Sequence, residues 1–131
     1  MKKIILALMA LFITIGISGC RTATIQNVPK QTIVQKMTQE EVGKSIVMAG
    51  NSLGWNMQKV SKGVIVATLF LRGHEAVVTI KYAADGYSIS YRDSKNLKYN
   101  AENQTIHSNY NGWVHNLDRA IKNNLVVNSY H

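Results

Sequence analysis

The stretch from Trp55 to Arg92 alternates apolar and polar residues over most of its length. Such alternation is the pattern of half-buried β-strands, because successive side chains of a strand point to opposite faces of a sheet. Polar turn sequences at 62–63, 73–75 and 83–86 divide the stretch into four segments of strand length. Connections this short join antiparallel neighbours, so the pattern predicts a four-stranded antiparallel meander.

The alternation gives the predicted sheet two chemically different faces. One face is largely apolar and is expected to form the core; it contains Ile65, Ala67, Leu69, Leu71, Ala76, Val78, Ile80, Tyr82, Tyr87, Ile89 and Tyr91. The other face mixes hydroxyl, cationic and apolar side chains. An uncovered face of this composition is a candidate recognition surface, and its candidate residues are Phe70, Arg72, Lys81 and Arg92. The alternative, that the N-terminal segment or a terminus covers it, is left open by the sequence.

Amphipathic helices are expected before and after the meander. Thr38-Gln39-Glu40-Glu41 is a capping-box pattern that predicts a helix start, and Gly54 marks the end of that helix. A second helix is predicted for residues 108–124 from apolar residues at helical spacing. Two helices on the apolar face of the sheet make a two-layer α+β domain over residues 38–131.

Residues 1–19 have the features of a signal peptide. Two lysines precede a largely apolar run from Ile4 to Ile17, which is shorter than the roughly 20 residues of a membrane span. The sequence Ile17-Ser18-Gly19-Cys20 resembles the lipobox of bacterial lipoproteins. This resemblance implies cleavage before Cys20 and acylation, for example with palmitate, of that cysteine. A free thiol or an intermolecular disulfide does not explain why the cysteine follows an apolar run.

The residues after the cysteine bear on location. In many Gram-negative lipoproteins an aspartate at this position retains the protein in the inner membrane, whereas this chain has Arg21. The resemblance therefore implies an outer-membrane lipoprotein that faces the periplasm. Residues 20–37 are polar, contain Pro29 and are expected to form a flexible lipidated tether with a reach of roughly 20–25 Å. A short edge strand at Ile33 and Val34 is the alternative.

Length and composition limit the class of the protein. About 112 residues follow the signal peptide, which is one ordinary domain. The chain has a formal net charge of +8 with scattered basic residues. This surplus indicates solubility or attraction to an anionic envelope component, and the export signal argues against nucleic acid as the partner. Because the chain has a single cysteine, no intrachain disulfide is available to the fold.

The segment from Tyr87 to Asn116 carries a family resemblance. It contains a YSI-x-Y motif at 87–91, an S-x-NL-x-Y motif at 94–99 and an IH-x-NYN-x-W motif at 106–113. In this order, after a helix and a sheet, the motifs resemble those of a group of small, uncharacterised proteobacterial lipoproteins. The resemblance covers nearly the whole mature chain. It implies a fold and a cell-envelope location, and it implies no known activity.

Polar residues late in the chain form the candidate binding cluster Ser94, Asn96, His107, Asn109 and Asn111. Amide side chains can both donate and accept hydrogen bonds to a ligand. The alternative is that Asn109 and Asn111 cap the last helix and that Asn96 forms a turn. The histidines lack the spacing that places two rings on one face, so neither a metal nor another cofactor is expected.

The aromatic residues have two interpretations. Their spacing along strands and in the last helix predicts that most are core, and the alternative is a surface that binds sugar rings or peptides. The residues concerned are Trp55, Tyr82, Tyr87, Tyr91, Tyr99, Tyr110 and Trp113.

The sequence thus favours a membrane-anchored periplasmic lipoprotein that acts as a non-enzymatic binding or structural module. Its expected partners are the membrane, through the lipid anchor, and an envelope protein or an anionic envelope component. One alternative is a small envelope hydrolase of glycans or peptides that uses Ser94, Asn96, His107 and Asn109, although no G-x-S-x-G motif is present. An inhibitor or immunity-type lipoprotein is the other alternative.

Overall fold

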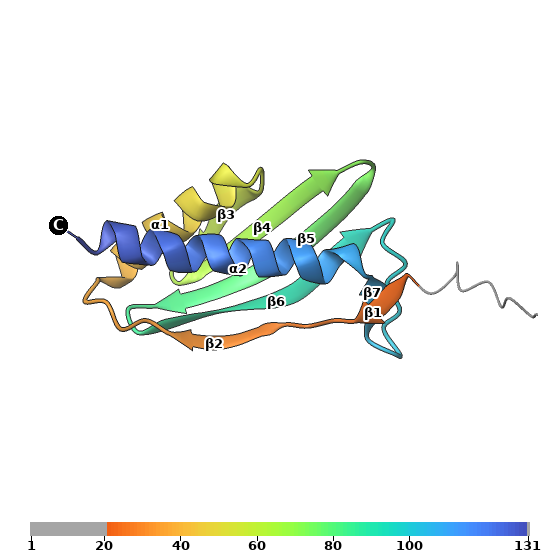
Figure 1. The fold of residues 1–131 in the computed structure, drawn as a ribbon, viewed down its shortest axis with the longest axis horizontal. Coiled ribbons are helices and arrows are strands. Elements are labelled where there is room, and N and C mark those ends of the chain that lie inside the picture. Colours follow the sequence, from red (N-terminus) through yellow and green to blue (C-terminus); the bar gives the residue numbers. More distant parts are fainter. Residues whose placement is uncertain (1–20, 131) are drawn as a thin grey trace, which may run out of the picture.

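The computed structural model describes residues 21–130, so the predicted signal peptide and Cys20 lie outside the described residues (Figure 1). The described chain is α+β, with two helices, a five-stranded antiparallel sheet and a two-stranded sheet. In chain order the elements are β1 Thr22–Thr24, β2 Val28–Thr32, α1 Gln39–Ser52, β3 Asn56–Ser61, β4 Val64–Leu71, β5 His74–Ala83, β6 Gly86–Lys95, β7 Thr105–His107 and α2 Asn109–Asn128.

The larger sheet has the strand order β2-β6-β5-β4-β3. Strands β3 to β6 pair antiparallel with their sequence neighbours, which confirms the antiparallel meander. The expected sheet of four strands is incomplete, because β2 pairs with the free edge of β6, with Val28 opposite Ile89. Pro29 lies in β2, an edge strand, where its missing N–H costs no hydrogen bond to a second neighbour.

The N-terminal segment is part of the fold. Strand β1 pairs antiparallel with β7, with Thr22 opposite His107, to form the two-stranded sheet. Residues 22–32 therefore contain two strands where the sequence analysis expects a flexible tether. The edge strand also ends before the expected position: Ile33 follows β2 as a buried residue, and Val34 is 85% exposed. These strands lack strong alternation of their own and are held by backbone pairing to distant parts of the chain.

Both helices cover the apolar face of the larger sheet. Tyr82 and Tyr87 are cross-strand partners on that face; Tyr82 lies against α1 at Gly43, and Tyr87 donates a hydrogen bond to Asp118 of α2. In Figure 1, α2 runs along the length of this face. The two-layer arrangement expected from the sequence is therefore present. Neither helix within residues 21–130 combines the length and the apolar character needed to cross a membrane.

The predicted start of α1 is confirmed in atomic detail. The Thr38 hydroxyl accepts the backbone N–H of Glu41 at 3.1 Å, and a Glu41 carboxylate oxygen accepts the backbone N–H of Thr38 at 2.8 Å. Both hydrogen bonds of a capping box are thus formed. Helix α2 begins at Asn109 as expected and extends to Asn128, beyond the predicted end at 124.

Glycine allows α1 to approach the sheet closely. A Cβ added at Gly43 would lie 2.7–2.9 Å from atoms of the Tyr82 side chain, closer than van der Waals contact permits. Glycine in a helix interior costs roughly 1 kcal/mol of helix stability relative to alanine. At Gly43 that cost is accepted because the tyrosine ring, which is buried, occupies the space.

We expect Gly43→Ala to lower the free energy of unfolding by about 1–2 kcal/mol, because overpacking against Tyr82 exceeds the gain in helix propensity. The matched control is Gly112→Ala in α2, where an added Cβ meets nothing within 4 Å. That change is expected to leave stability unchanged or raise it by up to about 1 kcal/mol. Urea unfolding followed by circular dichroism measures both. Equal effects of the two substitutions would contradict the close approach at Gly43.

Candidate functional site

The predicted polar cluster is divided between separate local contacts. The Ser94 hydroxyl lies 2.8 Å from the Tyr91 hydroxyl, and the Ser94 backbone N–H is donated to the Asp93 carboxylate. The Asn96 side chain donates to the backbone carbonyl of Gly73 at 3.1 Å and so fixes the β4–β5 turn. Ser94 therefore has a tyrosine, rather than a histidine, as the partner of its hydroxyl.

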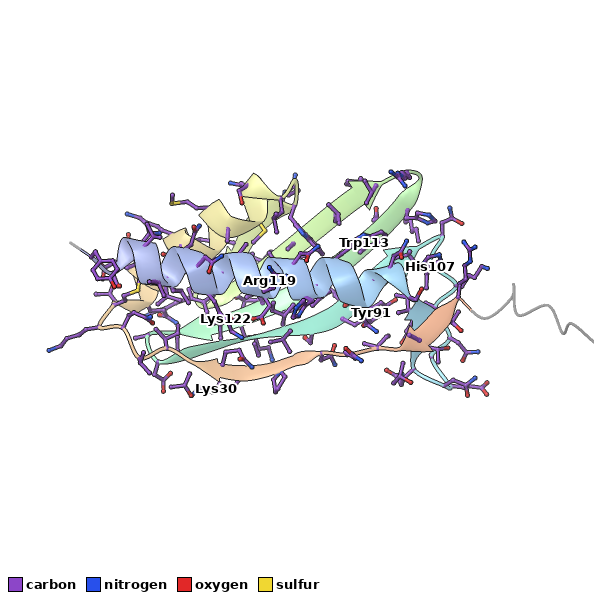
Figure 2. All side chains as sticks on the ribbon, in the orientation of Figure 1. Lys30, Tyr91, His107, Trp113, Arg119 and Lys122 are labelled. Atoms are coloured by element: carbon purple, nitrogen blue, oxygen red, sulfur yellow. The ribbon has the colours of Figure 1, made fainter. Side chains whose placement is uncertain are left out.

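Asn96 and His107 both contact His74, which was not among the predicted site residues. His74, at the start of β5, has its ring 5.8 Å from the ring of His107 and 6.3 Å from that of Trp113. Figure 2 shows His107 and Trp113 at the same end of the molecule. Since a carbonyl only accepts, His74 Nδ1 must donate its proton to the Asn96 carbonyl, 2.6 Å away. His107 Nδ1 accepts the Asn109 backbone N–H at 3.2 Å.

Asn111 belongs to a different environment. Its Oδ1 accepts the backbone N–H of Gln26 at 3.0 Å, and its Nδ2 donates to the Thr24 carbonyl at 2.9 Å. This amide therefore holds the segment between β1 and β2 against α2. Asn109, two residues before Asn111, is exposed. The five residues thus do not form one polar cluster. Ser94, Asn96 and Asn111 make separate contacts, and Asn109 is exposed.

A buried polar pair lies beneath α2. The Tyr87 hydroxyl donates to Asp118 Oδ1 at 2.5 Å, and the other carboxylate oxygen of Asp118 is 3.1 Å from Lys122 Nζ. Burial, together with the hydrogen bond and negative charge of Asp118, raises the pKa of Tyr87. Burial also raises the pKa of Tyr110, with a smaller contribution from Tyr91. Both tyrosines are therefore held in the neutral form in the folded chain.

These shifts predict a loss of stability at alkaline pH. The folded-state pKa of each tyrosine lies above its unfolded value of about 10. The folded chain therefore keeps its full stability with respect to these groups below about pH 10, and it loses stability as the pH rises further, because the tyrosines of the unfolded chain then ionise more readily. Each such group lowers the free energy of unfolding by up to about 1.4 kcal/mol per pH unit there. Urea midpoints between pH 8 and 12 measure the loss, and Tyr110→Phe should make it less steep. A midpoint that stays constant to pH 12 would rule this out.

The second face of the larger sheet is uncovered by either helix. Five of its residues that form cross-strand pairs are partly accessible, namely Val66, Thr68, Thr79, Ser88 and Ser90, whereas Val77 opposite Thr68 is buried. Phe70 is 69% exposed on β4, Lys81 is exposed on β5, and Arg92 reaches over the face to donate to the Thr79 hydroxyl at 3.3 Å. We call these eight accessible residues the open sheet face.

Arg72 is the one predicted face residue that lies elsewhere. It follows the end of β4 in the β4–β5 turn, with a φ of 52°. This left-handed conformation is uncommon for a residue other than glycine and is tolerated in turns. The alternation predicted a position on the face because it extended the strand one residue too far.

A basic hollow adjoins one end of the open sheet face. It has a volume of about 320 Å³, and its lining includes Lys30, Lys62, Lys81 and Ser88. Lys30 forms an exposed ion pair with Asp85 at 3.2 Å. Figure 2 shows Lys30 toward the end opposite His107. Because the lysines come from β2, the β3–β4 turn and β5, their proximity has no signal in the sequence.

Comparison with known proteins assigns no family. No protein-family model, curated protein or solved structure matches the chain. Among residues 21–130, no three His, Cys, Asp or Glu side chains come together in a group that could hold a metal ion. The open sheet face and its basic hollow together present accessible cationic, hydroxyl and apolar groups. We therefore take them as the candidate site.

Proposed function

We propose that the chain is an outer-membrane lipoprotein, anchored through Cys20 and facing the periplasm, that binds an envelope partner through the open sheet face. The anchor is supported by the lipobox sequence and by the resemblance of the 87–116 segment to small lipoproteins. The observation that carries the binding role is a sheet face left uncovered by both helices, with Phe70 exposed and Lys81 and Arg92 near its rim. Exposed apolar and cationic groups on one face suit a protein or an anionic envelope component.

The contacts of the polar cluster support a binding module over a hydrolase. A serine nucleophile needs a general base within hydrogen-bond reach, and the contact of the Ser94 hydroxyl is Tyr91. The Asn96 and Asn111 amides are engaged with backbone groups. An inhibitor or immunity-type lipoprotein would differ from this proposal only in the identity of the partner.

Mass spectrometry of the native protein tests the anchor. The expected product begins at Cys20 and carries acyl chains on that residue. An unmodified thiol, or a chain that retains residues 1–19, would refute the anchoring part of the proposal.

Site-specific photo-crosslinking in intact cells tests the binding face. A photoreactive amino acid at Ser90, on the open sheet face, is expected to give crosslinked products. The matched control is the same probe at Arg119, which is exposed on α2. Identification of the product distinguishes an enzyme target, as for an inhibitor, from a structural component. Products at Arg119 with none at Ser90 would refute the assignment of the face.

A further inference from the structure

The fold begins immediately after the anchoring residue. The carbonyl of Arg21 accepts the backbone N–H of Ser108 at 2.7 Å, and Thr22 is already paired with His107. Ile25 continues the attachment by donating its N–H to the Gln104 carbonyl at 2.8 Å. If Cys20 carries the lipid, adjacent Cα atoms separate the anchor from the folded domain by only about 3.8 Å. No free chain remains to act as a spacer.

A continuous set of contacts defines the end of the domain nearest the anchor. Ser108 follows His107, whose backbone N–H is donated to the Leu97 carbonyl at 2.8 Å. Asn96, the residue before Leu97, donates a side-chain hydrogen bond to the carbonyl of Gly73 in the β4–β5 turn. Strands β1 and β7, the segment after β6 and the β4–β5 turn therefore lie together at the end where α2 begins (Figure 1).

The exposed residues at this end have the chemistry of a membrane-contacting surface. We define the proximal end by its cations Arg21, Arg72 and Lys98 and its apolar residues Leu71 and Tyr99. Leu71 and Tyr99 are 39% and 38% exposed. Aromatic rings are favoured at the headgroup level of a bilayer, and cations are attracted to anionic lipids. Glu102 is an exposed carboxylate in the same loop region.

We propose that the proximal end rests directly on the leaflet that holds the lipid anchor, so that the domain stands on the membrane instead of hanging from a tether. This inference rests on the proposed lipidation of Cys20. The strands run away from this end, and a ten-residue strand such as β5 spans about 33 Å. The sheet then stands roughly perpendicular to the membrane, so that the open sheet face points sideways into the periplasm. The basic hollow lies at the end of the sheet that is far from the membrane.

Labelled protein on vesicles tests this orientation. The full lipidated protein is reconstituted in vesicles of three parts phosphatidylethanolamine to one part phosphatidylglycerol that contain a headgroup nitroxide. A fluorophore is placed on a cysteine introduced by Lys98→Cys, at the proximal end, or by Lys62→Cys, in the β3–β4 turn. Both are exposed lysines, and lipidated Cys20 offers no competing thiol.

The expected result is nitroxide quenching several-fold stronger at position 98 than at position 62. Equal quenching at both positions, or stronger quenching at position 62, in protein that floats with the vesicles would overturn the orientation and leave the anchor intact. Protein that fails to float and has an unmodified Cys20 in its mass spectrum would overturn the proposed function and this inference together.

Discussion

Exchange of residues 1–20 for a secretory leader that is cleaved just before Arg21 is expected to move the protein from the membrane to the soluble periplasmic fraction. Lipid attachment contributes about 0.8 kcal/mol for each buried methylene, and several acyl chains hold a protein stably where one chain holds it marginally. Neither helix within the described residues provides a membrane span. If Cys20 is acylated as proposed, its loss should therefore abolish nearly all membrane retention.

Leader exchange is sharper than Cys20→Ala alone. In lipoproteins the peptidase acts at the modified cysteine, so the single substitution would also retain the apolar run from Ile4 to Ile17. Carbonate extraction and sedimentation measure the distribution, and circular dichroism verifies that the exchanged form is folded. Retention of a folded, leader-exchanged protein in carbonate-washed membranes would show that another part of the chain holds it there.

The elements that the sequence predicts well are those with strong local signals. The Thr38 capping box specifies the start of α1 through contacts between residues three positions apart, and the structure forms both of its hydrogen bonds. The alternation after Trp55 specifies β4 to β6 because each of these strands buries one face and joins its neighbour by a short turn. The mostly exposed edge strand β3 is specified by the short turn that joins it to β4. Both kinds of signal are complete within a few residues of sequence.

The N-terminal strands illustrate what such reasoning misses. Residues 22–24 and 28–32 have polar sequences with isolated apolar positions, which resemble a tether when taken alone. Their strand conformation depends on β6, β7 and Asn111, which lie more than fifty residues away in the chain. A pairing edge supplied by a distant strand has no local pattern. The prediction of the proximal end follows from this structural result alone.

Part of the candidate site was predictable because it also depends on a local pattern. Alternation places Phe70, Lys81 and Arg92 on one side of the sheet, and the structure leaves that side uncovered by the helices. The polar cluster was inferred from residue type and closeness in sequence, but its members lie on different elements. Ser94 is in β6 and His107 is in β7, whereas Asn111 is in the first turn of α2. Asn111 thus holds the N-terminal segment while His107 faces His74. The β4–β5 turn places His74 beside Asn96 and His107, which lie more than twenty residues away in the chain.

Tyr110→Ala is expected to lower the free energy of unfolding by about 3–5 kcal/mol, a large fraction of the roughly 5–15 kcal/mol of an ordinary domain. Tyr110 is 1% exposed and packs edge-on against Tyr91, with ring centroids 5.8 Å apart. Tyr91 in turn stacks on Tyr99 at 4.4 Å. Truncation leaves a cavity between the first turn of α2 and β6, and urea unfolding at pH 7 measures its cost.

Tyr110→Phe is the matched control, because it keeps the ring and removes the hydroxyl. Within residues 21–130 that hydroxyl has no hydrogen-bond partner, so the change is expected to alter stability by less than about 1 kcal/mol. A large loss for alanine with a small one for phenylalanine identifies the ring as core. If Tyr110→Ala instead kept full stability and abolished crosslinking to the envelope partner, the aromatic residues would be a recognition surface, as sugar-binding and peptide-binding aromatics are.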